Sequence, residues 1–149
     1  MAYFVLNNRV SFLEILDTAG YEEYEVMQEM YIKQGQGFVL VYAVDKKESF
    51  EEVKKVKRRV DRMNDFKQVS AILVGNKCDL VNNIEVTTEE GQALANELNA
   101  QFIEASAKSG LNCDEIFHNL VRDIRKKQTP IFEPKEEGFW NKFFSCNLV

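Results

Sequence analysis

Two long apolar runs limit the folds open to this chain more than any other feature of its sequence. Residues 37–45 and 69–76 are almost continuously apolar, and a shorter run of the same kind spans 101–105. A strand with one face in water alternates apolar and polar residues, whereas an unbroken apolar run is typical of a strand buried on both faces of a parallel sheet. The runs therefore predict a parallel sheet that is covered on both sides.

Helical patterns separate these runs. A small polar residue followed three positions later by Glu opens each of three segments, at Ser49, Thr87 and Asn112, and this spacing indicates a capping box. Apolar residues then recur at spacings of three and four, as on the buried face of a helix. The basic run over 54–59 is expected on the solvent face of the first helix. The alternation of strand and helix from Gly37 onward predicts an α/β fold.

Both ends of the chain differ from this alternating middle. Two β-prone runs, 3–6 and 10–16, are separated by Asn7 and Asn8, which tolerate positive φ, so they predict one antiparallel hairpin. Past Lys127 the composition shifts to prolines, glutamates and late aromatic residues. We therefore expect one domain over 1–127 and a flexible tail over 128–149.

Composition narrows the class of protein. The net charge of −5 argues against a nucleic-acid partner, because such proteins usually carry a basic surplus. Three cysteines without a C-x-x-C pair predict a reduced intracellular protein rather than a disulfide scaffold. No apolar run reaches the roughly 18 residues of a membrane-spanning helix. These features are typical of a cytosolic domain.

Two short motifs follow predicted strands, at the edge where ligands bind in doubly wound sheets. In the first, Asn76-Lys77-Cys78-Asp79, the Asp carboxylate can accept the two adjacent N–H donors on one edge of guanine, a pair that adenine lacks. Asn76 can hydrogen-bond a ring nitrogen, and the Lys77 stem can lie along the base. In the second motif, Ala105-Ser106-Ala107-Lys108, a backbone N–H can meet the guanine carbonyl. Either tetrapeptide alone also arises by chance.

A third motif, Asp17-Thr18-Ala19-Gly20, ends the hairpin. Asp17 can hold magnesium through the water shell of the ion, and Gly20 lets a backbone N–H approach a terminal phosphate. The alternative is a purely structural Asp-Thr helix cap followed by a turn glycine.

Taken together, the order and spacing of D-T-A-G, N-K-C-D and S-A-K resemble the Ras family of small GTPases, and Rap proteins especially. The resemblance runs from about Tyr3 to Lys127 and includes 13–20, 35–38 and 73–80. It implies a P-loop-NTPase-like (Ras-type) fold that binds GTP or GDP with Mg²⁺, hydrolyses GTP, and switches effectors under exchange and activating proteins. It also implies that the three motifs named above form the nucleotide site.

The chain departs from the family in two places. No G-x-x-x-x-G-K-[ST] sequence occurs in it, so we expect the loop that cradles the phosphates and supplies a magnesium ligand to be absent. The first strand and first helix of the fold, and the threonine-bearing effector switch that precedes the hairpin in the family, are expected to be absent with it. The resemblance places that first strand centrally, between the strands ending at Asp17 and Asp45, so we expect two unpaired apolar edges. Tyr21 stands where most relatives have the glutamine that orients the attacking water, which predicts slow hydrolysis and leaves no catalytic residue assigned.

The last four residues, Cys146-Asn147-Leu148-Val149, resemble a C-a-a-X prenylation box, so Cys146 is the expected lipidation site. Asn147 and Val149 fit the pattern less well, and which isoprenoid would be attached stays open. One lipid anchors a protein only marginally, and the four aromatic residues between 139 and 144 can add apolar membrane contact. The alternative is that these aromatic residues pack back on the domain.

Two functional interpretations remain open at this point. The first is a Ras/Rap-like GTPase sequence that lacks its N-terminal part, with impaired binding and hydrolysis of GTP, on the cytoplasmic face of the plasma membrane or an endomembrane. The second is a nucleotide-independent pseudo-GTPase that acts as an interaction protein. A phosphate-loop coding sequence in frame upstream of Met1 would favour the first, and a stop codon there the second.

Overall fold

The computed structural model describes residues 2–6, 9–17, 25–65, 67–128 and 144–148. Its elements, in chain order, are β1 (Ala2–Leu6), β2 (Arg9–Asp17), α1 (Glu25–Gln34), β3 (Gly37–Ala43), α2 (Lys47–Met63), β4 (Ser70–Asn76), α3 (Thr88–Glu97), β5 (Gln101–Glu104), α4 (Cys113–Gln128) and β6 (Phe144–Leu148). The predicted strands and the three predicted helices are present. Helix α1 was not predicted, because its ten residues show no clear apolar stripe.

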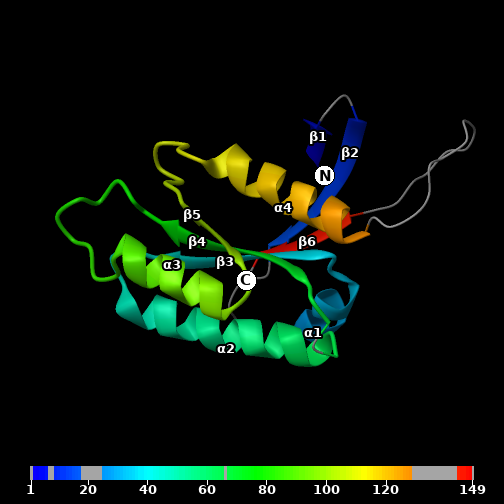
Figure 1. Ribbon diagram of the computed structural model, residues 1–149, viewed down its shortest axis with the longest axis horizontal. Coiled ribbons are helices and arrows are strands. Elements are labelled where there is room, and N and C mark those ends of the chain that lie inside the picture. The colour runs from blue at the N-terminus through cyan, green and yellow to red at the C-terminus, as the bar shows by residue number, and fades with distance from the viewer. Residues whose placement is uncertain (1, 7–8, 18–24, 66, 129–143, 149) are drawn as a thin grey trace, which may run out of the picture.

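The strands form one sheet with the order β1-β2-β6-β3-β4-β5. β1 pairs with β2 antiparallel, as the hairpin prediction requires, and every other neighbouring pair is parallel. Figure 1 shows α4 on one face of the sheet and α2 and α3 on the other. The predicted α/β fold with a parallel sheet and one antiparallel hairpin is therefore confirmed.

Two apolar clusters explain why the sequences of β3 and β4 are almost continuously apolar. Phe38, Leu40 and Leu73 pack with α2 and α3 on one face of the sheet. Val39 and Ile72 pack with the apolar stripe of α4 on the other face. Alternate residues of the same strand thus enter different clusters, and neither face meets water.

The C-terminal segment corrects two expectations. Within 128–149, the expected flexible tail, Phe144–Leu148 forms β6, and β6 lies between β2 and β3. Residues 129–143 of that segment lie outside the described residues. The expected unpaired edges are therefore paired: Asp17 lies opposite Leu148 on one side, and Val39 lies opposite the same residue on the other. The physical reason is that buried strands need partners for their backbone N–H and C=O groups, and an extended segment of the same chain supplies them.

Two of the predicted helix starts, at Thr87 and Asn112, were right, and the one at Ser49 was shifted. The capping box of Thr87 and Glu90 is present at the start of α3. α2 begins earlier than predicted, at Lys47, and the Ser49 hydroxyl in its first turn donates to the Lys46 carbonyl. Before α4, Asn112 has a φ of 60° and its side-chain amide donates to the Glu104 carbonyl, which ties the loop to β5. None of the described helices is long and apolar enough to cross a membrane.

Candidate functional site

The site predicted from sequence lies at the carboxyl edge of the parallel strands. Asp17 ends β2, Asn76 ends β4, and the Ser106 motif follows directly after β5. Because these strands run in the same direction, their carboxyl ends meet at one edge of the sheet. The fold therefore brings the end of the hairpin and the two motifs predicted to recognise the base to the same edge.

Asn76 joins the loop of residues 76–79 to the loop of residues 105–108. Its side-chain oxygen accepts hydrogen bonds from the backbone N–H of Lys77, at 2.8 Å, and from that of Ala107, at 3.1 Å. The Cys78 N–H also donates to the Ala105 carbonyl, at 3.1 Å. Lys77 has a φ of 67°, a left-handed conformation in which the chain turns sharply after β4. One amide side chain and one backbone bond thus hold the loops in a fixed relative position.

The Asp79 carboxylate is held by the second loop. Ser106 is fully buried, and its hydroxyl donates to Asp79 Oδ1 at 2.6 Å while it accepts from the Ser109 N–H at 3.2 Å. The pKa of Asp79 lies below its ordinary value, chiefly because of the hydrogen bond from Ser106, with further help from its own backbone N–H and from the charges of Lys108 and Lys77. The carboxylate is exposed and oriented, so it can accept donors from a ligand.

Lys77 has a partner that the sequence did not indicate. Its ammonium group lies 2.8 Å from the Asp45 carboxylate, two residues past the end of β3. Both side chains are partly exposed, so the pair positions the lysine stem more than it stabilises the fold. No sequence signal links the two residues, because they are 32 positions apart, in the loops that follow two neighbouring strands.

The structure describes only some of the other residues predicted to belong to the site. Asp17 is exposed at the end of β2, and a carboxylate oxygen is the type of group that Mg²⁺ prefers. Among the described residues, no group of three or more possible metal ligands gathers. Gly20 and Tyr21 lie outside the described residues. Cys146 lies in the middle of β6, opposite Ile15 of β2 and Gly37 of β3.

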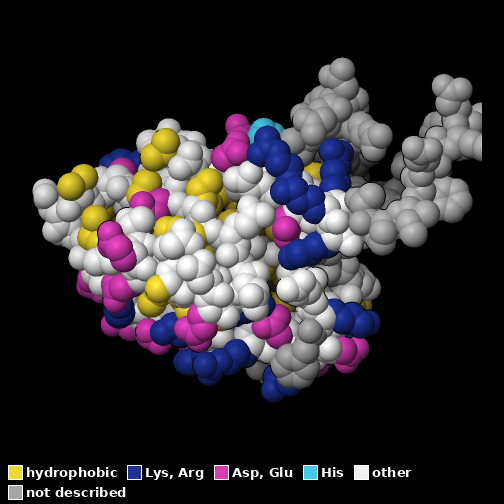
Figure 2. Space-filling model, viewed as in Figure 1, with side chains coloured by type: hydrophobic (Ala, Val, Ile, Leu, Met, Phe, Trp, Pro, Cys, Tyr) yellow, Lys and Arg dark blue, Asp and Glu magenta, His cyan; other side chains and the backbone are white. Residues whose placement is uncertain are grey.

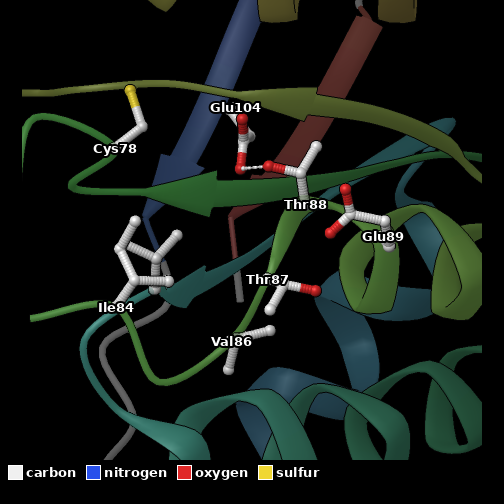
Figure 3. Close-up of a pocket in the computed structure, with 8 residues that line it drawn as sticks. Cys78, Ile84, Val86, Thr87, Thr88, Glu89 and Glu104 are labelled. Atoms are coloured by element: carbon white, nitrogen blue, oxygen red, sulfur yellow. Dashed lines mark hydrogen bonds between the residues drawn. The ribbon is translucent and has the colours of Figure 1, made fainter. Parts of the chain in front are cut away.

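A small cavity, which the sequence did not predict, lies beside the loop of residues 76–79. Its volume is about 240 Å³, and its lining residues are Val44, Cys78, Ile84, Val86, Thr87, Thr88, Glu89 and Glu104. Figure 3 shows the Thr88 hydroxyl pointing to the Glu104 carboxylate, and the two are joined by a 2.8 Å hydrogen bond. Burial, followed by the charges of Glu104 and Asp79, raises the pKa of Cys78, so this thiol is not an activated nucleophile.

Charge is distributed unevenly over the described surface. Figure 2 shows Lys and Arg side chains gathered over the C-terminal end of α4, whereas basic and acidic side chains are interspersed along α2. The last turn of α4 carries Arg125, Lys126 and Lys127, where positive charge complements the negative end of the helix dipole.

Comparison with known proteins identifies the family of the chain. The model of the Ras family matches residues 2–126. The chain belongs to the Ras family. Its relatives in this family include "Ras-like protein 2" of Mucor circinelloides f. lusitanicus, 43% identical over 124 residues, and "Ras-like protein 1" of Saccharomyces cerevisiae, 46% identical over 121 residues. "Protein ras-1" of Neurospora crassa is 44% identical over 128 residues.

These alignments cover 81–86% of this Ras-family chain, but only 39–63% of the relatives. The chain therefore spans about two fifths to three fifths of the length of the curated relatives it matches. The family match establishes a Ras-like small GTPase fold and family.

Proposed function

We propose that the chain carries the guanine-recognition half of a Ras-type nucleotide switch, with base choice made by Asp79. The observation that supports this most directly is the hydrogen bond between Ser106 and Asp79, which fixes the carboxylate at the edge of the sheet. A carboxylate in this position accepts two neighbouring N–H donors, and guanine presents such a pair whereas adenine does not. The Ala107 N–H lies on the adjoining loop, which Asn76 positions.

We further propose that GTP or GDP binds with Mg²⁺ and that effectors and regulatory proteins read the bound state. Asp17, through water, is the described residue assigned to the ion, and Mg²⁺ would neutralise charge on the phosphates. The 149 residues contain no G-x-x-x-x-G-K-[ST] motif, which is the sequence of a phosphate-cradling loop. Base contacts alone are worth a few kcal/mol, so we expect this chain to bind GTP at about millimolar to high-micromolar affinity.

A substitution at Asp79 tests whether this residue selects the base. In a protein that carries a family-like N-terminal segment ahead of residue 1, Asp79→Asn reverses the donor and acceptor pattern offered to the base. We expect loss of guanine affinity and gain of xanthine affinity, measured by nucleotide-binding titration. Glu85→Gln, which changes an exposed acid near this edge, is the matched control and should leave base preference unaltered. An unchanged preference in Asp79→Asn would refute the assignment.

We also propose that Cys146 is lipidated and attaches the chain to the cytoplasmic face of a membrane. The support is the four-residue C-a-a-X-like ending after a Ras-family domain, together with the basic last turn of α4. Membrane fractionation of Cys146→Ser tests this. The variant should be released to the soluble fraction, whereas Cys113→Ser, a cysteine within the domain, should fractionate like the parent chain.

A further inference from the structure

The space between β2 and β3 is a slot for one parallel strand. β2 and β3 both pair with β6 and not with each other. With strand spacings of about 4.8 Å, the two flanking strands are held roughly 10 Å apart. The slot has the width of a single extended chain.

Helix α4 fixes the width of this slot from one face of the sheet. Its Val121 packs against Leu13 of β2, and its Leu120 and Ile124 pack in the cluster that contains Val39 of β3. All five side chains are at most 2% exposed. One helix therefore spans the slot and contacts the strand on either side, so the two strands cannot close on each other without breaking this packing.

β6 is paired on both sides over its last residues. Five residues of β6 lie opposite Leu13 to Asp17 of β2, and Cys146, Asn147 and Leu148 also lie opposite Gly37, Phe38 and Val39 of β3. The segment contains neither proline nor a charged residue, which suits an interior strand. The backbone of Cys146 is therefore enclosed between two strands.

We propose that this slot is a strand-accepting site whose occupant is the chain's own C-terminal segment, Phe144–Leu148, and that strand insertion and lipidation of Cys146 exclude one another. An enzyme that modifies Cys146 must hold it and its flanking residues in its own site, and the same backbone groups pair with β2 and β3 in the sheet. The exclusion rests on the proposed lipidation, whereas the insertion rests on the strand pairing alone. Lipidation would uncover two strand edges that are otherwise paired.

Hydrogen exchange of the full chain tests insertion. We expect the amides of 145–148 to exchange at least 100-fold more slowly than in the free peptide 139–149. Asn147→Pro should abolish this protection, because proline removes a donor from an interior strand, while Asn147→Thr should retain it. Exchange of 145–148 at the rate of the free peptide would overturn the proposal.

A disulfide lock tests insertion without a disruptive proline. Leu16 and Asn147 lie opposite each other, so Leu16→Cys with Asn147→Cys should form an intramolecular disulfide on oxidation. Tyr3→Cys with Asn147→Cys is the matched control and should not form one, since β2 separates β1 from β6. Equal cross-linking of both pairs would contradict the strand order.

The same locked chain tests exclusion, because Cys146 keeps a free thiol. Isoprenoid transfer to Cys146 should be at least ten-fold slower in the oxidised chain than in the reduced chain, and fastest in the peptide 139–149. Equal transfer in both forms overturns the exclusion. If the peptide accepts neither isoprenoid, both the proposed lipidation and the proposed exclusion are refuted. Hydrogen exchange would still test the insertion of β6 independently.

Discussion

The Ser106 hydroxyl donates a 2.6 Å hydrogen bond to the Asp79 carboxylate across 27 positions of sequence. Ser106 is fully buried and Asp79 is exposed, so a rigid interior donor orients a carboxylate that faces solvent. A side-chain hydrogen bond therefore joins the two motifs, which are far apart in the sequence. Besides standing next to the backbone N–H of Ala107, the serine orients the Asp79 carboxylate.

Removing the Ser106 hydroxyl should weaken guanine binding and change its pH dependence. The hydrogen bond lowers the pKa of Asp79, so the carboxylate stays charged, and able to accept from guanine, down to a lower pH than an ordinary Asp. In Ser106→Ala the acid limb of binding should move to higher pH, and affinity at neutral pH should fall by about ten-fold or less. Titration from pH 3.5 to 8 in the protein with a family-like N-terminal segment measures both effects.

The control for this prediction is Ser109→Ala, which keeps the Ser106 hydroxyl and the backbone N–H that donates to it. It should bind guanine nucleotides with the pH profile of the parent protein. Superimposable profiles for Ser106→Ala and the parent would show that the hydrogen bond does not control the ionisation of Asp79.

The sequence predicted the parallel sheet because β3 and β4 are buried on both faces and therefore carry unbroken apolar runs. It also predicted that the Asn76 and Ser106 loops share an edge, since both follow parallel strands. It could not predict the pairing of Lys77 with Asp45, because no periodicity links residues on different strands. The position of β6 escaped prediction for a related reason: the partner edges of a strand are set by the whole sheet.

Lys57 is a second residue whose environment the sequence pattern did not predict. The basic run around it predicts a solvent-exposed face of α2, yet Lys57 is only 5% exposed and its ammonium lies 2.6 Å from Asp61. Asp61→Ala should destabilise the fold by about 3 kcal/mol, because it leaves a buried charge without its partner. Lys57→Met should be nearly neutral, since it replaces the charge by an apolar chain of similar length.

Urea unfolding measures these effects, and the pair of Lys55 and Glu52 on the same helix supplies the control. Its side chains are well exposed, so Glu52→Ala should cause no measurable change. If Asp61→Ala were as mild as Glu52→Ala, burial of Lys57 would have no energetic consequence. Adding Lys57→Met to Asp61→Ala should recover most of the lost stability.

Tyr21 is predicted to limit GTP hydrolysis, although it lies outside the described residues. It follows D-T-A-G, where a glutamine amide would orient the attacking water, and a phenol cannot reproduce that geometry. In the protein with a family-like N-terminal segment, Tyr21→Gln should speed single-turnover hydrolysis by about ten-fold or more. Tyr21→Phe should stay slow and both variants should keep the parent's nucleotide affinity. An equal or slower rate in Tyr21→Gln would assign the limit to another residue.

Gly91 of α3 should resist replacement by alanine, although alanine is normally the better helix former by about 1 kcal/mol. A Cβ at this position would lie 2.5 Å from both the Tyr42 hydroxyl and the Phe102 ring, and ring atoms in a packed core cannot easily withdraw. Overpacking of this kind costs about 1–3 kcal/mol, so the clash outweighs the gain in propensity. Thermal unfolding should show a lower Tm for Gly91→Ala, and an unchanged Tm for Gln92→Ala on the exposed side of the helix.

Tyr42→Phe separates the clash from other effects of the alanine. The Tyr42 hydroxyl is buried without a hydrogen-bond partner among the described residues, and burial, followed by the charges of Glu104 and Glu90, raises its pKa to about 12. Its removal should be neutral or stabilising by up to about 1 kcal/mol. It should also make Gly91→Ala less costly, since one of the two contacts at 2.5 Å disappears while the one with Phe102 stays. If Gly91→Ala lowers stability equally in the parent and in Tyr42→Phe, the whole clash lies with Phe102. If Gly91→Ala lowers stability in neither, the close packing of α3 on the sheet is refuted.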